Sequence, residues 1–277
     1  MRGVQDTLSD EVLVTAVARN HRKASITVVS PAHNAAHFYN GWLQSIEAQE
    51  YEDLEVILVD DGSEDGLLSQ VSLAPDFLRC IRQDRRGPAG ARNAAIRASR
   101  GDCIAFLDLD DRWARGHLDR LASALRDHPE AGIAQGLIRK FVSGPGGELS
   151  YCSEAYRFVN LGACLFRREV FDRCGLFDED LRFAEDFDLI VRCWEQGIPK
   201  IEVPAVSLLY HRHGGNMTNG KNTVELGAVQ VYKRRLDRIR AGSVDHSMVE
   251  SRRVAFPDYI GRTAGPFDEG LREPVEL

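Results

Sequence analysis

The stretch Cys103–Trp113, CIAFLDLDDRW, carries the strongest prediction about the fold. Its apolar first half is typical of a buried strand, and three carboxylates follow within four positions. In open α/β sheets ligands bind at the carboxyl ends of strands, and clustered oxygen ligands suit a hard divalent cation that carries phosphates. The stretch therefore predicts such a site at Asp108, Asp110 and Asp111. For an isolated Asp-x-Asp sequence, a solvated acidic turn is the alternative.

The chain before this stretch alternates between strand and helix patterns. Ile26–Ser30 and Leu54–Val59 are predicted to be strands, and Pro31 is expected to end the first. Between them apolar residues recur at i, i+3, i+4 and i+7, which predicts a helix. Two parallel strands joined by a helix form a right-handed βαβ unit. A short strand at Leu78–Ile81 and an alanine-rich helix at Ala91–Ala98 continue the series. The first half is therefore predicted to be a Rossmann-like nucleotide-binding half.

Beyond Pro129 the alternation changes, and we expect strands and helices in a different order. The expected elements are strands at Ile133–Val142 and Ala155–Val159, a short helix at Arg167–Arg173, a helix at Phe187–Trp194, a strand at Ile201–Tyr210 interrupted by Pro204, and a basic helix at Val229–Ile239. The fold class is therefore α/β, with a mixed central β-sheet flanked by helices. We expect an N-terminal arm (1–24, weakly helical at Asp10–Ala18), one domain (25–220), and a C-terminal helix and tail (221–277).

Composition excludes several classes of function. The 277 residues carry a formal net charge of −7 and no basic stripe across the core, so nucleic acid is not an expected partner. Six cysteines without a Cys-x-x-Cys pair predict a reducing compartment and no zinc site. No apolar run approaches the roughly 18 residues that span a bilayer, and Val12–Ala18 is too short for the core of a signal peptide. We therefore expect a cytoplasmic protein.

Two more acidic pairs and one histidine loop could belong to a site. Asp60-Asp61 closes the second strand at the same sheet edge as Asp108, although Asp-Asp-Gly-Ser is also an ordinary turn sequence. Glu185-Asp186 opens a predicted helix, where the helix dipole alone favours carboxylates; a general base is the functional interpretation. The loop Tyr210–Asn216 has two histidines and an arginine directly after a strand, suited to a metal and to phosphate.

Taken together, five motifs in this order resemble the inverting family 2 glycosyltransferases of the GT-A fold. They are Ser30–Asn34 (SPAHN), Val59–Ser63 (VDDGS), Gly90–Ala95 (GARNAA), Leu107–Asp111 (LDLDD) and Glu185–Leu189 (EDFDL). The resemblance covers roughly residues 25–220, and five motifs in register are more specific than any one alone. It implies the inverting transfer of a sugar from a nucleotide diphosphate donor, with uridine as the family-level expectation for the base, to an acceptor hydroxyl. It also implies a Mg²⁺ or Mn²⁺ cofactor.

The resemblance also implies roles for individual residues. Donor-binding positions would be Pro31, Asn34, Asp60 or Asp61, Arg92, Asp108 and Leu109. Asp110, with Asp111, would bind the metal that bridges the diphosphate, and His213 would complete that site. Asp186 would be the catalytic base, with Glu185 and Arg212 on the acceptor side. The sequence departs from the family at His33, where the family often has Tyr or Phe, and Leu181–Ala184 does not identify an acceptor.

The sequence leaves some alternatives open. A nucleotidyltransferase that forms sugar nucleotides would need a Gly-rich loop after the first strand, and a receiver-type phosphoacceptor module would be shorter, with its Asp pair after the first strand. A sugar-nucleotide-binding module without turnover also remains. The acceptor would be a glycan or a lipid-linked sugar. The basic helix could rest on the inner face of a membrane, although most such helices are solvated on one face and packed on the other. The oligomeric state is left open.

Overall fold

The structure is a computed structural model, and it describes residues 23–72, 74–217, 219–222, 225–243, 254–261 and 273–275. The predicted helical stretch Asp10–Ala18 and most of the polar tail after Gly261 lie outside the described residues.

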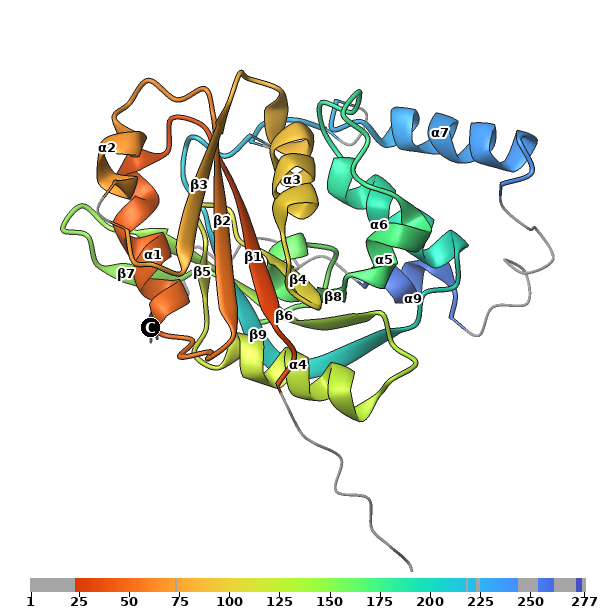
Figure 1. The fold of residues 1–277 in the computed structure, drawn as a ribbon, viewed down its shortest axis with the longest axis horizontal. Coiled ribbons are helices and arrows are strands. Elements are labelled where there is room, and N and C mark those ends of the chain that lie inside the picture. Colours follow the sequence, from red (N-terminus) through yellow and green to blue (C-terminus); the bar gives the residue numbers. More distant parts are fainter. Residues whose placement is uncertain are drawn as a thin grey trace, which may run out of the picture.

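A central mixed sheet organises the molecule (Figure 1). Its strands follow the order β10-β7-β6-β8-β4-β1-β2-β3, and β9 pairs with β6 and β5. The strands are β1 (Ile26–Ala32), β2 (Leu54–Asp61), β3 (Leu78–Gln83), β4 (Cys103–Phe106), β5 (Arg112–Trp113), β6 (Ile133–Ser143), β7 (Leu149–Tyr151), β8 (Cys164–Arg167), β9 (Lys200–His211) and β10 (Glu273–Pro274). Strands β3, β2, β1 and β4 run parallel, whereas β8 is antiparallel to both β4 and β6. The predicted α/β class and mixed sheet are confirmed.

Helices cover both faces of the sheet. They are α1 (Tyr39–Glu47), α2 (Leu67–Val71), α3 (Gly87–Ala98), α4 (His117–Asp127), α5 (Glu169–Cys174), α6 (Glu185–Glu195), α7 (Ala228–Arg240) and α9 (Phe256–Ile260), with 3-10 turns η1 (Ala36–Phe38) and η2 (Leu161–Ala163). Successive strand residues point to opposite faces, so Val28 packs with α1, α2 and α4, and Val29 with α3, α5 and α6. The sheet therefore separates two cores. A third, small cluster joins α6 to α7.

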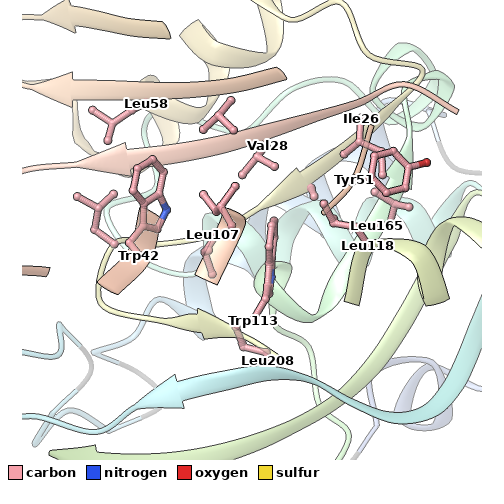
Figure 2. Close-up of a cluster of buried hydrophobic side chains, with 14 of the residues drawn as sticks. Ile26, Val28, Trp42, Tyr51, Leu58, Leu107, Trp113, Leu118, Leu165 and Leu208 are labelled. Atoms are coloured by element: carbon pink, nitrogen blue, oxygen red, sulfur yellow. The ribbon is translucent and has the colours of Figure 1, made fainter. Parts of the chain in front are cut away.

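The core on the α1 and α4 face is built around two buried tryptophans. Trp42 and Trp113 lie among aliphatic residues of the sheet, as Figure 2 shows. Each indole also has a polar partner, because Trp42 Nε1 donates to Ser30 Oγ (3.1 Å) and Trp113 Nε1 donates to the Gly162 carbonyl (2.8 Å). Satisfied indole N–H groups fix the orientation of these large side chains and remove the cost of burying them.

Several sequence-based boundaries were wrong. Ala155–Val159 is not a strand; only Tyr156 bridges Ile138, and the strand beside the turn is β7. The reason is that β8 pairs with Ile133–Gln135 and β7 with Phe141–Ser143, so only the short stretch of β6 between them is left for 155–159. Arg167 ends β8 rather than starting a helix, and β1 continues through Pro31. The short elements β5, β8 and α9 were not predicted.

Pro204 does interrupt the pairing of β9, as expected. Gln135 pairs with Glu202 and Leu137 with Val206, so residues 203–205 of β9 bulge opposite Gly136. A Cβ on Gly136 would lie 2.0 Å from Ser207 Oγ, so only glycine fits there. Proline is tolerated at such a bulge because its missing N–H breaks no regular ladder bond.

In the described part of the chain, every helix is too short or too polar to cross a membrane. All six cysteines are free thiols, five of them buried.

Candidate active site

The loops that follow β1 and β2 are joined to each other at the carboxyl edge of the sheet. Asn34 has a left-handed backbone (φ 51°). Its backbone N–H donates to Ser63 Oγ (3.0 Å), and its side-chain carbonyl oxygen accepts from Glu64 N (2.9 Å). His33 Nδ1 lies 2.9 Å from the Asp61 carbonyl oxygen. Pro31, expected to line the nucleotide, lies in register with Val59 just before this loop. The predicted donor loop is therefore held by side chains rather than by regular secondary structure.

The two carboxylates that end β2, Asp60 and Asp61, are buried and already have protein partners. Asp60 is fully buried, with Oδ1 accepting from Ser63 N (2.9 Å) and Oδ2 lying 3.4 Å from Arg82 Nη1. Asp61 accepts from the backbone amides of Arg86 and Gly87, both at 2.8 Å, at the start of α3. Asp61 thus satisfies orphan amides of that helix start. Both residues shape the edge of the site.

Arg92 of α3 connects two parts of the site that are far apart in sequence. Its guanidinium lies 2.9 Å from Asp108 Oδ1, after β4, and 2.6 Å from Glu185 Oε1, at the start of α6. The side chain is buried, which lowers its pKa, but the charges of Asp108, Glu185 and Asp186 outweigh burial and raise it overall. A permanently charged Arg92 therefore holds Asp108 and Glu185 beside one another, within range of the charge of Asp186.

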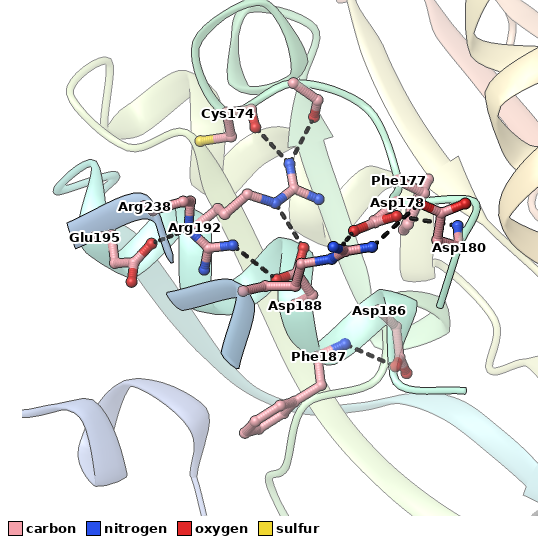
Figure 3. Close-up of polar contacts among 12 residues, drawn as sticks. Cys174, Phe177, Asp178, Asp180, Asp186, Phe187, Asp188, Arg192, Glu195 and Arg238 are labelled. Carbon is pink, nitrogen blue, oxygen red and sulfur yellow. Dashed lines mark hydrogen bonds and ion pairs between the residues drawn. The ribbon is translucent and has the colours of Figure 1, made fainter. Parts of the chain in front are cut away.

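Asp186 is the second residue of α6, two positions after a strained residue. Ala184, the N-cap, has φ 60° and gives no side-chain cap, while Asp186 Oδ1 accepts from Phe187 N at 2.7 Å (Figure 3). Burial raises the pKa of Asp186, and Arg92 lowers it in part. Burial also raises the pKa of Glu185 against the same opposing charge. A carboxylate with a raised pKa in a site suits a general base.

Asp110 and His213 meet across the site, as the sequence suggested. His213 Nε2 lies 3.0 Å from Asp110 Oδ2, and the Asn216 amide nitrogen lies 3.5 Å from the same oxygen. Burial first, and then the charge of Asp108, raises the pKa of Asp110, while His213 lowers it. The described residues contain no group of three ligand side chains positioned for a metal. Two ligands still fit Mg²⁺ or Mn²⁺, because such ions are commonly held by one or two protein ligands plus substrate phosphates.

Other predicted residues have different surroundings. Asp111 is buried, and its Oδ1 accepts from His211 N at 2.8 Å, which ties β9 to the acidic turn. Leu109 is buried in the core, so its side chain cannot contact a donor. Arg212 is exposed beside His213 at the end of β9. His211 stacks on Phe141 (4.5 Å between ring centroids), and burial lowers its pKa to about 4.

Asn93 and Asn216 are not among the site residues predicted from the sequence. Asn93 bonds Phe177 through both its amide atoms and Glu179 through its nitrogen, all at 2.9 Å. Asn216 accepts from His213 N at 2.8 Å and so positions that histidine. The partners of Asn93 lie more than 80 residues away, so no local sequence pattern indicates them.

The chain is similar to known proteins in both sequence and fold. The Glycosyl transferase family 2 model matches residues 27–177. The succinoglycan biosynthesis protein ExoO of Rhizobium meliloti is 34% identical over 70% of this chain and 62% of its own length. The Escherichia coli UDP-Glc:alpha-D-GlcNAc-diphosphoundecaprenol beta-1,3-glucosyltransferase WfaP is 25% identical over 71% of this chain and 80% of its own. The chain thus spans less than two thirds of ExoO.

Two solved structures share the fold. S. aureus TarS in complex with UDP-GlcNAc superposes with a TM-score of 0.62 at 21% identity, over 80% of this chain and 67% of that one. The mannosyltransferase PcManGT from Pyrobaculum calidifontis, in complex with GDP-Man and Mn²⁺, gives 0.57 at 23% identity, over 87% of this chain and 68% of that one. At this identity they confirm the expected GT-A fold alone. With the family model covering more than half of the sequence, the chain belongs to glycosyl transferase family 2.

Proposed function

We propose that the protein transfers a sugar, with inversion, from a nucleotide diphosphate sugar to an acceptor hydroxyl. The observation that carries the proposal is the joining of Asp108 after β4 to Glu185 at the start of α6 by the buried Arg92. This links the donor-side acidic turn to the proposed base, Asp186. A nucleotidyltransferase is set aside because the matching family is one of glycosyl transferases.

A divalent cation, Mg²⁺ or Mn²⁺, would be held by Asp110 and His213, and it would offset the diphosphate charge so that the nucleotide can leave. The 3.0 Å approach of the two side chains supports this pair. Asp111 is a weaker candidate, because one of its oxygens accepts from the His211 amide. We therefore drop Asp111 from the proposed ligand set.

Asp186 would take the proton of the acceptor hydroxyl as that hydroxyl attacks the sugar from the side opposite the leaving nucleotide. Its Oδ1 already accepts from Phe187 N, which fixes the orientation of the carboxylate. Burial raises its pKa, so it is a stronger base than a solvated aspartate. Glu185 is paired with Arg92 and is therefore less suited to accept a proton.

We infer a glycan or lipid-linked acceptor of polysaccharide synthesis. ExoO is named for succinoglycan biosynthesis, and WfaP for transfer to a diphosphoundecaprenol-linked sugar. UDP is the proposed donor nucleotide, as in the names of WfaP's substrate and the TarS complex. Contact with a membrane surface is a weaker proposal, because Arg234, Arg235 and Arg238 of α7 pair with carboxylates of the domain.

A thermal-shift screen tests the donor site directly. UDP, GDP, CDP and ADP are each added with Mn²⁺, Mg²⁺ or EDTA, because a ligand that binds only the folded state raises stability by RT ln(1 + [L]/Kd). We expect one nucleotide to give a metal-dependent shift that Asp110→Ala abolishes. If no nucleotide shifts the melting temperature, the donor site is refuted.

The base is tested by replacing Asp186 with asparagine, which keeps the shape and removes the charge. Positioned proton transfer typically contributes about 10²- to 10⁴-fold, so turnover should fall by that factor. The metal-dependent nucleotide shift should remain. Normal turnover in Asp186→Asn would remove the assignment.

A further inference from the structure

The first turn of α6 and the loop before it are held from two sides. On one side α3 contributes Asn93, which bonds Phe177 and Glu179, and Arg92, which pairs with Glu185. On the other side lies α7, which the sequence predicts to be a basic helix with one apolar face. The segment 177–188, which includes the proposed base, therefore lies between α3 and α7.

Ion pairs from α7 reach both ends of this segment. Arg234 lies 2.7 Å from Asp178 and 3.2 Å from Asp180 in the loop, and Arg238 lies 3.1 Å from Asp188 within α6 (Figure 3). Arg238 also lies 2.8 Å from Glu195 at the far end of α6. One helix thus contacts the chain before and after Asp186.

Two of the α6 carboxylates depend on these partners. The side chains of Asp188 and Glu195 are 2% and 1% exposed. Buried charges are tolerated only when paired, and losing one partner of such a pair is strongly destabilising. Arg192 on α6 itself pairs with Asp188 at 2.8 Å, but Glu195 takes its pairs from Arg235 and Arg238 of α7. The α6 sequence is therefore suited to a helix that α7 covers.

Packing at the start of α7 reaches the residue before the acidic pair. Gly227, the N-cap of α7, has φ 90°, and a Cβ there would lie 3.0 Å from the Phe183 carbonyl oxygen and 3.6 Å from Ala184 Cβ. Val231, the buried residue of α7, packs with Leu181 and Val191. The strained Ala184 packs against this same cluster, and its left-handed backbone sets the direction in which α6 begins.

We propose that α7 positions the general base: Arg234, Arg238 and Gly227 hold the turn 183–188 so that Asp186 keeps its place beside Arg92 and Asp108. The inference rests on the proposed function. Arg234 and Arg238 act through this turn and are positioning residues. The helix belongs to the catalytic domain, although it lies beyond residues 27–177 of the family model.

A matched pair of double variants tests the inference. R234Q/R238Q removes two charges that contact the segment, whereas K233Q/R240Q removes two charges from the exposed side of the same helix. We expect kcat to fall about 10- to 100-fold in the first variant, as for a misplaced catalytic group, with the KM for the sugar nucleotide little changed. The control variant should match the wild type. R234K/R238K, which keeps the charges, should recover part of the loss.

A second measurement does not depend on turnover. Amide hydrogen exchange of residues 184–190 in the absence of substrate should be faster in R234Q/R238Q and unchanged in K233Q/R240Q. Equal exchange in both variants, or faster exchange over the whole domain, overturns the inference. A wild-type protein that turns over no sugar nucleotide refutes the proposed function, while the exchange result still decides whether α7 holds the turn.

Gly227→Ala provides a variant without any change of charge. The added methyl meets Phe183 and the positive φ becomes strained, so the turn must shift. We expect the same fall in kcat and the same local rise in exchange. Unchanged kcat and exchange in this variant would also contradict the inference.

Discussion

Replacing Arg92 with glutamine is the sharpest test of how the site is assembled. Arg92 is buried and pairs with Asp108 and Glu185, so the substitution leaves two carboxylates without their cation. The two are not equivalent. The side chain of Asp108 is 46% exposed and water can solvate it, whereas that of Glu185 is 10% exposed and stays desolvated.

Removing one partner of a buried ion pair costs about 3–5 kcal/mol, and the exposure of Asp108 favours the lower end. At about 2–4 °C per kcal/mol for a domain of this size, the melting temperature should fall by about 6–12 °C. Without Arg92, the pKa of Glu185 should rise further, because burial already raises it and Arg92 opposes that rise. A folded-state pKa above the unfolded value favours the protonated folded form, so the loss of stability should grow as pH rises above the ordinary pKa of a glutamate.

Urea unfolding at several pH values measures this loss. Arg97→Gln on the same helix is the matched control, because Arg97 is 56% exposed and lies 3.9 Å from Glu179. Its cost should stay within about 0.5 kcal/mol. Adding Glu185→Gln to Arg92→Gln should recover part of the stability, since no charge is then left buried without a partner. The reasoning is refuted if Arg92→Gln behaves like the control, or if the second substitution restores nothing.

Two further predictions concern buried polar side chains. Asn93→Ala removes three hydrogen bonds to Phe177 and Glu179, so the free energy of unfolding should fall by about 1–3 kcal/mol or more, as measured in urea; a neutral effect would mean that water replaces the side chain. His117 is buried against Trp113, and burial lowers its pKa to about 3, so only the unfolded chain binds its proton between that pH and its ordinary pKa. Stability should therefore decline as pH falls below about 6.5, and His117→Phe should flatten this slope; an unchanged slope would contradict it.

The parallel half of the fold could be predicted from the sequence because its signals are local. Val56–Val59 is a continuous apolar run, and a strand buried on both faces requires such a run. The antiparallel part was predicted less well. β8 (Cys164–Arg167) is a four-residue strand whose pairing with β4 and β6 depends on residues 29 to 64 positions away. No periodic pattern within β8 itself reports those partners.

The same distinction applies to the site. Asp110, Asp186 and His213 were chosen from motifs, and the structure brings Asp110 and His213 together. The sequence could not separate Asp110 from Asp111, because both follow the same strand. What distinguishes them is a hydrogen bond that Asp111 accepts from the backbone N–H of His211, 100 residues later in the sequence. Likewise, nothing local indicated that the basic residues of α7 face Asp188 and Glu195 rather than solvent.

Two non-glycine residues at this site have a positive φ, and each lies in a turn that surrounding contacts fix. Asn34 (φ 51°) follows the first strand, and Ala184 (φ 60°) precedes the acidic pair of α6. Asparagine tolerates this region, but alanine does so at a cost of order 1–3 kcal/mol. Such strain persists only where surrounding contacts fix the backbone. Ala184 packs against the cluster that contains Val231 of α7, and Glu185, one residue later, pairs with Arg92 of α3. The turn before Asp186 is therefore held by the two helices that flank it.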